Sequence, residues 1–213
     1  MDLRPTIHSP TYLPSVSQSL RGYRLARWIS ILFSPPLVAT LATLIAAAIT
    51  PQDMTWYGAS IMILLIVLFP ISYLGFLYNT GKIIDLDVYN RTQRFRPYLF
   101  SLICILFAVI ILVEGNAPLI LIVLSVAVLI ETVGLFMVNF LWKISAHTAA
   151  IAGFSTFFCL TVGSGVIPIL LLIPIVAWSR VHLRRHTLAQ TIVGGAWGAT
   201  SFLLTFIYFP LLG

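Results

Sequence analysis

The chain has 213 residues, of which 60% are hydrophobic and 8% are charged, and its formal net charge is +6. A mean hydropathy of +1.04 excludes an ordinary water-soluble domain, and repeated long apolar runs indicate transmembrane helices. No alternating ten-residue pattern suggests a membrane β-barrel. We therefore predict an all-α polytopic transmembrane bundle, with no nucleic acid among its partners.

The N-terminal segment, residues 1–27, is polar and differs from everything that follows. It is rich in Ser, Pro and Thr, and it ends with Arg21, Arg24 and Arg27 at a spacing of three. That spacing, with aromatic residues among the arginines, is typical of a helix at the headgroup level of anionic membrane lipids. We predict a cytoplasmic tail with a basic interfacial segment over 1–27 and a single transmembrane domain over 28–213.

The apolar runs in the remainder predict about seven spans. Pro35, Pro36 and Pro70 predict kinks in the first two spans, and Pro168 and Pro174 predict a distorted sixth span. Small residues such as Gly194 and Gly198 predict close helix contacts along the last span. The predicted spans are 28–50, 55–79, 97–114, 117–141, 147–164, 166–180 and 187–211.

The distribution of positive charge predicts the orientation. Seven spans place the connections alternately on two faces, and all twelve Lys and Arg fall on one of them. Positive charge in short loops stays cytoplasmic. We expect an integral membrane protein of the cell inner membrane, with the charged loops in the cytoplasm and the C-terminus outside.

Two polar fragments stand at that face, 143–147 and 179–190. His186 and Gln190 are four residues apart, so they share one face of a helix. The guanidinium of Arg180, two imidazoles and the N–H groups of helix starts together describe an oxyanion site. The same residues are also typical of simple anchoring of helix ends by interfacial charge.

These fragments resemble motifs of the type 2 phosphatidic acid phosphatase superfamily. Ser145-Ala146-His147 is similar to its Ser-Gly-His, and Ser179-Arg180-x5-His186 is similar to its Ser-Arg-x5-His. The resemblance covers roughly residues 140–200. It implies a phosphatase-like helical core that hydrolyses a lipid or polyprenyl phosphate or diphosphate through a phosphohistidine. His186 is then the nucleophile, His147 the general acid, and Arg180 the ligand of the phosphate oxygens.

Further residues follow from the resemblance. Gln190 stands where the family usually has a carboxylate, so we assign it the role of orienting the His186 ring. The phosphate-binding set is then completed by Ser145, Ala146, Arg94, Arg96 and Lys143.

Several positions depart from the family pattern. Besides Gln190, Ile144 and Ala146 stand at the Pro and Gly positions of the family's Pro-Ser-Gly-His motif. The family's first motif, Lys-x6-Arg-Pro, is matched only at Arg96-Pro97, because Tyr89 stands at its Lys position. An alternative is therefore a catalytically silent relative that serves as a structural or lipid-binding subunit of a membrane complex. A small transporter with a phosphate-lined vestibule is a further alternative.

The acidic residues leave their roles open. In the loop before the third span, Asp85 and Asp87 either tune a histidine or hold Mg²⁺, or they pair with the arginines of the same loop. Glu131, in the middle of the fourth span, is a functional candidate or a protonated group bonded to a neighbouring helix. His147, His182 and His186 lack a clear fourth metal ligand, so we expect neither a metal nor a cofactor.

Overall fold

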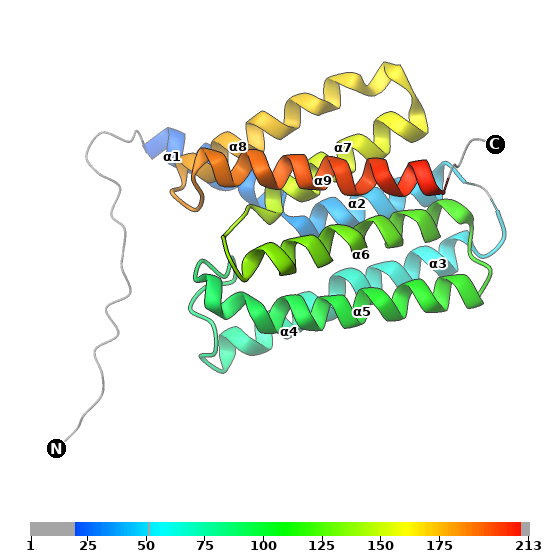
Figure 1. Cartoon of the computed structure of the whole chain (residues 1–213), viewed down its shortest axis with the longest axis horizontal. Coiled ribbons are helices and arrows are strands. Elements are labelled where there is room, and N and C mark those ends of the chain that lie inside the picture. The colour runs from blue at the N-terminus through cyan, green and yellow to red at the C-terminus, as the bar shows by residue number, and fades with distance from the viewer. Residues whose placement is uncertain (1–19, 51, 210–213) are drawn as a thin grey trace.

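The computed structural model describes residues 20–50 and 52–209, and this part of the chain is all-helical, without a strand. Figure 1 shows the helices lying roughly along one direction as a bundle. In chain order they are α1 (Leu20–Leu32), α2 (Pro35–Ala48), α3 (Thr55–Met62), η1 (Ile63–Leu68), α4 (Phe69–Asn79), η2 (Arg91–Arg94), α5 (Phe95–Glu114), α6 (Leu119–Asn139), α7 (Ala146–Val162), η3 (Ser164–Leu171), α8 (Leu172–His182) and α9 (Leu188–Tyr208).

Five helical segments are long and apolar enough to cross a membrane. A sixth is counted if α1 and α2, which meet at a bend of 47°, form one span. With 17 residues, α7 is apolar but shorter than these, so a seventh span stays a prediction. The long apolar segments are 55–79, 91–114, 119–139, 164–182 and 188–208.

Prolines interrupt the helices at the predicted places. The break between α1 and α2 falls directly before Pro35, which begins α2. Ahead of Pro70, the helix widens into the π-helical turns of η1, and a ring nitrogen without N–H is a common cause of such irregularity. Pro168 lies inside η3, a 3-10 segment that follows the turn at Gly163. The predicted distortion of the sixth apolar run is therefore confirmed.

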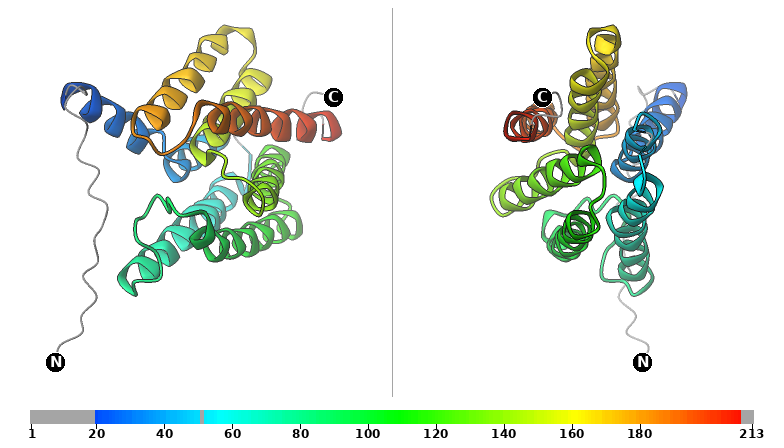
Figure 2. Two further views of the ribbon diagram at one scale, coloured as in Figure 1. Left: turned by 60° about the vertical axis from the view of Figure 1, so that its left-hand side comes forward. Right: turned by 90° about the vertical axis from the view of Figure 1, so that its right-hand side faces the viewer.

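The closest helix packing joins α7 and α9, which cross beside each other in Figures 1 and 2. A Cβ on Gly194 would lie 2.5 Å from the Ser145 carbonyl oxygen, and one on Gly198 would lie 2.1 Å from that of Ala149. No side chain fits at these distances. The predicted small-residue contacts are thus real, and they hold the N-terminal ends of α7 and α9 together.

Charge gathers at one end of the bundle. Figure 1 places the start of α1 and the α4–α5, α6–α7 and α8–α9 connections on its left-hand side. Arg4 lies outside the described residues, and the other eleven Lys and Arg lie in α1, in these connections, or in the helix turns next to them, as Arg96 does in α5 and Arg180 in α8. Asp53 and Glu114 lie at the opposite end, in the α2–α3 connection and at the end of α5. We call the end that carries the Lys and Arg residues the basic end.

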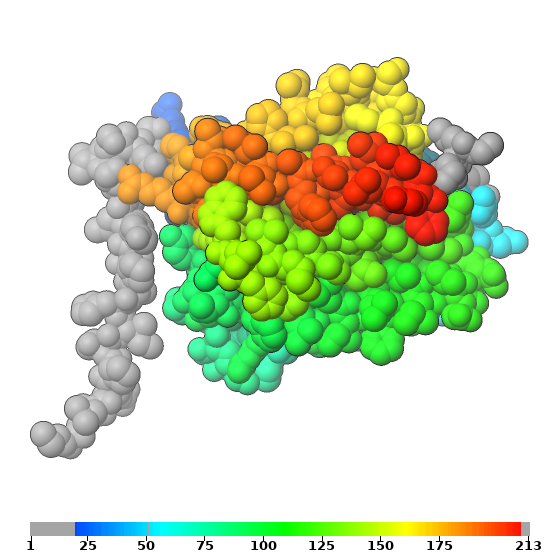
Figure 3. Space-filling model, in the orientation of Figure 1, coloured from blue at the N-terminus to red at the C-terminus, as the bar shows by residue number. Residues whose placement is uncertain are grey.

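The apolar core runs through the middle of the bundle. It joins side chains of α2, α3, α5, α6, α7, α8 and α9, with Leu121, Ile151 and Phe157 fully buried. Side chains of α5, α6 and α9 close the face shown in Figure 3. Elsewhere, exposed Ile71 on α4 and exposed Leu86 in the following loop both line an internal cavity. The cavity therefore reaches the surface beside α4 and this loop.

Candidate functional site

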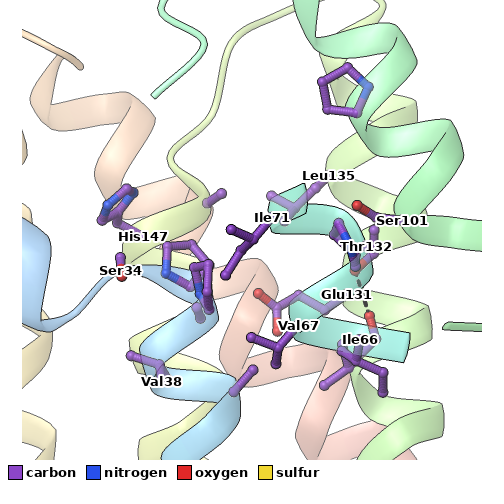
Figure 4. A pocket seen from close by; sticks show the side chains of 18 of the residues that line it. Ser34, Val38, Ile66, Val67, Ile71, Ser101, Glu131, Thr132, Leu135 and His147 are labelled. Carbon is purple, nitrogen blue, oxygen red and sulfur yellow. Dashed lines mark hydrogen bonds between the residues drawn. The ribbon is translucent and has the colours of Figure 1, made fainter. Parts of the chain in front are cut away.

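A cavity of about 520 Å³ extends from the basic end into the bundle. At the basic end its lining includes Arg180, His147 and His186, which come from α8, α7 and the turn before α9. Deeper inside, the lining is mostly apolar and contains Glu131 of α6, as Figure 4 shows. A polar mouth above an apolar chamber suits an amphiphile with an anionic head.

Local hydrogen bonds place the two histidines. Ser145 caps α7, because its hydroxyl accepts the N–H of Thr148 at 3.4 Å. Its own N–H donates to the Gln190 carbonyl at 3.1 Å, which ties the start of α7 to the first turn of α9. His147 is the second residue of α7, and His186 is two residues before α9. The tie between the helix starts therefore also brings both imidazoles to one cavity mouth.

The His186 ring lies beside the side chain of Gln190. Its Nδ1 lies 3.2 Å from Gln190 Oε1, and the same oxygen accepts the N–H of Thr187 at 3.1 Å. In return, Thr187 Oγ1 accepts the N–H of Gln190 at 3.3 Å, which completes a capping box. An oxygen that already accepts one N–H is an acceptor for Nδ1 as well. His186 therefore carries its proton on Nδ1 and leaves a lone pair on Nε2.

His186 is also kept neutral by its surroundings. Burial, followed by the positive charges of Lys143, Arg94 and Arg180, lowers the pKa of its imidazole to about 2. The side chain is only 7% exposed. A neutral ring with a free Nε2 is a competent nucleophile near neutral pH.

Arg180 is a buried cation with unused hydrogen-bonding capacity. It is 2% exposed, and its Nη1 donates to Asp87 Oδ2 at 3.1 Å and to the hydroxyl of Ser30 on α1. Its Nε has no hydrogen-bond partner among the described residues. A buried guanidinium that keeps one N–H unpaired is suited to accepting a further anion.

Asp87 balances the charge of this cluster. Burial alone would raise the pKa of its carboxyl, but the charges of Arg180, His147 and Arg185 outweigh burial, so the pKa is lowered. Arg185 lies 3.7 Å from Asp87 and 3.5 Å from Asp85. Both acids of the loop thus face arginines. The described residues contain no group of three or more His, Cys, Asp or Glu placed to hold a metal ion.

His147 lies across the cavity mouth from the α9 start. It is 9% exposed, and its ring makes a hydrogen bond with the backbone of Ser30. Ser30 thus contacts both His147, through its backbone, and Arg180, through its hydroxyl. His147 of α7 and Arg180 of α8 thus both contact the same residue of α1, and this contact brings them close together.

The remaining predicted phosphate ligands differ in their placement. Arg94 lines the cavity, with its Nε donating to the Val88 carbonyl at 2.8 Å, and Ala146 lines it too. Ser145 is fully buried as the α7 cap and is not part of the lining. Arg96 is exposed and lies outside the lining.

Lys143 lies close to the site but outside the cavity lining. Its Nζ donates to the Arg185 carbonyl at 2.8 Å and lies 3.8 Å from the centre of the Tyr89 ring. Burial, together with the charges of Arg94, Arg180 and Arg185, lowers the pKa of this amine to about 8. Lys143 is not part of the lining, but its charge acts on His186.

Two participants could not be assigned from the sequence. Ser30 lies in an apolar run without any motif, so no signal marked it. Asp87 was recognisable only as one of two loop acids, and its pairing with Arg180 joins residues 93 positions apart. Only the packing of the α4–α5 loop over α8 creates that contact.

Comparisons of this chain with protein-family models, with curated proteins and with solved structures find no match. The resemblance to the type 2 phosphatidic acid phosphatases therefore rests on the two motifs alone, and membership of that superfamily stays a prediction.

Proposed function

We propose that the protein is a membrane phosphatase that hydrolyses a lipid or polyprenyl phosphate or diphosphate through a phosphohistidine. The observation that carries this proposal is the orientation of His186. Its Nδ1–H is held by Gln190 Oε1, so its lone pair lies on Nε2, at a cavity mouth that also holds Arg180. A seven-span phosphatase-like core and a cytoplasmic site belong to the same proposal.

The proposed reaction has two steps. His186 Nε2 attacks phosphorus and forms a P–N bond, while the P–O bond to the lipid breaks and its electron pair leaves with the lipid oxygen. His147, in its protonated form beside the phosphate dianion, donates a proton to that oxygen. Water then attacks phosphorus and gives one proton to His147, which the first step left neutral; the P–N bond breaks with its electron pair going to Nε2, and phosphate and neutral His186 are released. Arg180 and Arg94 stabilise the charge on the phosphoryl oxygens.

The apolar chamber supports a lipid substrate. A phosphate at Arg180 places the rest of its molecule among side chains of α2, η1, α4 and α6. Exposed Ile71 lines this chamber on α4, so the chain of a lipid has a lateral path from the bilayer.

The alternative is a catalytically silent, lipid-binding subunit of a membrane complex. It is favoured by the 3.1 Å pair between Arg180 and Asp87, which occupies part of the anion site, and by an amide at position 190. An amide orients His186, but it does not stabilise an imidazolium as a carboxylate does.

The deciding experiment is phosphate release by the purified protein from lipid and polyprenyl phosphates and diphosphates. We expect turnover by the wild type, an acid-labile phosphoenzyme, and loss of both in His186→Ala. The matched control is His182→Ala at the end of α8, which removes a histidine that does not line the cavity and should retain turnover. If the wild type releases no phosphate from any substrate, the silent alternative holds. If His186→Ala is as active as the wild type, the motif is a coincidence of spacing.

A further inference from the structure

The cavity contains a second polar group that the proposed chemistry does not use, the carboxyl of Glu131. It lies on α6 and is 6% exposed, yet it belongs to the cavity lining. Figure 4 shows the Glu131 side chain directed into the cavity, toward the side on which His147 lies.

No described residue makes a hydrogen bond with this carboxyl group. Only the backbone of Glu131 is engaged, because its carbonyl accepts the indole N–H of Trp197 at 2.9 Å. The neighbouring hydroxyl of Thr132 donates to the Val128 carbonyl at 2.8 Å and so does not turn to the acid. The carboxyl oxygens keep some accessible surface although the residue is buried, so a ligand in the cavity can contact them. Burial of an acid without a partner is costly, which favours a partner that arrives with a ligand.

The place of the carboxyl is kept open by a glycine. A Cβ on Gly153 of α7 would lie 3.1 Å from Glu131 Oε2 and 2.5 Å from the Phe202 ring. Gly153 is six residues after His147 on the same helix, so this point lies about 9 Å deeper along α7, at 1.5 Å per residue. One cavity thus has an anion site at its mouth and a lone carboxyl about 9 Å below it.

We propose that Glu131 is a second ligand subsite, which accepts a hydrogen bond from a hydroxyl or amide N–H group on the chain of a phosphorylated lipid. A carboxyl offers an acceptor oxygen in either protonation state, so a donor group is complementary to it in both. The proposal rests on the proposed function only in assigning the phosphate to Arg180. It makes Glu131 a specificity-determining residue, because a chain without a donor leaves the carboxyl unpaired.

The test is binding of matched alkyl phosphates to the His186→Ala protein in nanodiscs, which requires no turnover. The probes have one chain length and carry a single hydroxyl group at successive carbons, with the plain alkyl phosphate as reference. We expect a gain in affinity of roughly tenfold, the effect of one buried hydrogen bond, confined to a few neighbouring positions. In the His186→Ala protein, a second change, Glu131→Leu, should abolish this gain and leave the affinity for the plain alkyl phosphate unchanged. Glu131→Gln, which keeps an acceptor oxygen in its amide, should retain the gain.

The position scan needs no change at Glu131, so it decides the matter even where Glu131→Leu does not fold. A hydroxyl group that is equally effective, or ineffective, at all positions overturns the subsite. So does an equal loss in Glu131→Leu for hydroxylated and plain probes. Failure of the phosphatase proposal has another signature: the wild type hydrolyses none of these probes, and yet they bind with the same positional preference.

Discussion

At the level of single residues, the Gln190 side chain has two tasks. Its Oε1 accepts the N–H of Thr187, which starts α9, and it lies 3.2 Å from His186 Nδ1, which sets the imidazole tautomer. A replacement at this position therefore affects both the start of α9 and the orientation of the His186 ring. Variants that separate the two tasks are the most informative.

We expect Gln190→Glu to increase the rate of phosphoryl transfer. A Glu oxygen still accepts both N–H groups, and its charge stabilises the imidazole as the ring becomes positive. Gln190→Leu should lower the rate roughly 10²-fold, because the ring loses its orientation. The measurement is single-turnover phosphate release, with helix content by circular dichroism as the control for folding. A slower Gln190→Glu protein would contradict the proposed role of His186.

Lys143 predicts the pH dependence of substrate binding. Its pKa is lowered to about 8, so its positive charge beside the anion site is lost as the pH rises through that value. We expect the KM for a lipid phosphate to increase roughly tenfold between about pH 7 and pH 9, from the loss of one partly buried charge. Lys143→Arg stays charged and should keep a flat KM profile over this range.

The conformational stability should increase with pH in the range in which substrate binding weakens. Between about 8 and the ordinary value of 10.5, the folded protein binds fewer protons at Lys143 than the unfolded chain does. Stability therefore rises with pH over this interval as far as Lys143 is concerned. A KM that increases only because the protein unfolds would be recognised by a parallel loss of stability.

At the level of elements, the contact between α7 and α9 positions the site. Gly194 and Gly198 allow the α9 backbone to approach the carbonyls of α7, and the Ser145 N–H bonds directly to the Gln190 carbonyl. His147 and His186 lie at the starts of these helices, so their relative position depends on this approach.

Gly198→Ala should destabilise the protein by about 1–3 kcal/mol, as overpacking does. Its Cβ would lie 2.1 Å from the Ala149 carbonyl oxygen, which belongs to helix backbone and cannot rotate away. Gly195→Ala is the matched control on the same helix, since its Cβ would lie at an ordinary 3.6 Å from Ile173. Thermal unfolding in detergent compares the two. Equal melting temperatures would show that the helices do not need this close approach.

At the level of the whole molecule, the basic end and the cavity mouth coincide. The positive charges that are expected to keep these loops in the cytoplasm also surround the anion site. Asp53 and Glu114 lie at the opposite end. One distribution of charge thus predicts the orientation of the bundle and, for the proposed lipid phosphate, the leaflet from which it would enter.

We expect the basic end to face the cytoplasm. In a protein whose native Cys104 and Cys159 are replaced by Ala, a single Glu114→Cys should react with an impermeant thiol reagent in intact cells. Lys82→Cys, at a position on the α4–α5 loop that is also exposed, should react only after permeabilisation. Labelling of Lys82→Cys in intact cells would reverse the orientation and place the site outside.

The sequence by itself determined the helical, membrane-spanning character of the chain and the approximate helix ends. Apolar runs must form helices in lipid, where backbone groups need internal partners, and prolines and glycines mark interruptions locally. The sequence also predicted that His186 lies close to Gln190, but the predicted reason, a shared helix face, was wrong. His186 lies two residues before α9, and Gln190 reaches it from the capping box at the start of that helix.

The tertiary structure alone decided which polar groups meet. Arg180 contacts Ser30 and Asp87, residues 150 and 93 positions away, because α1 and the α4–α5 loop pack against α8. The same packing leaves Arg96 outside the cavity and turns Glu131 into it. Periodicity reports which face of a helix is apolar, but not which neighbour covers it, and in lipid that choice depends on the fit between small and large side chains.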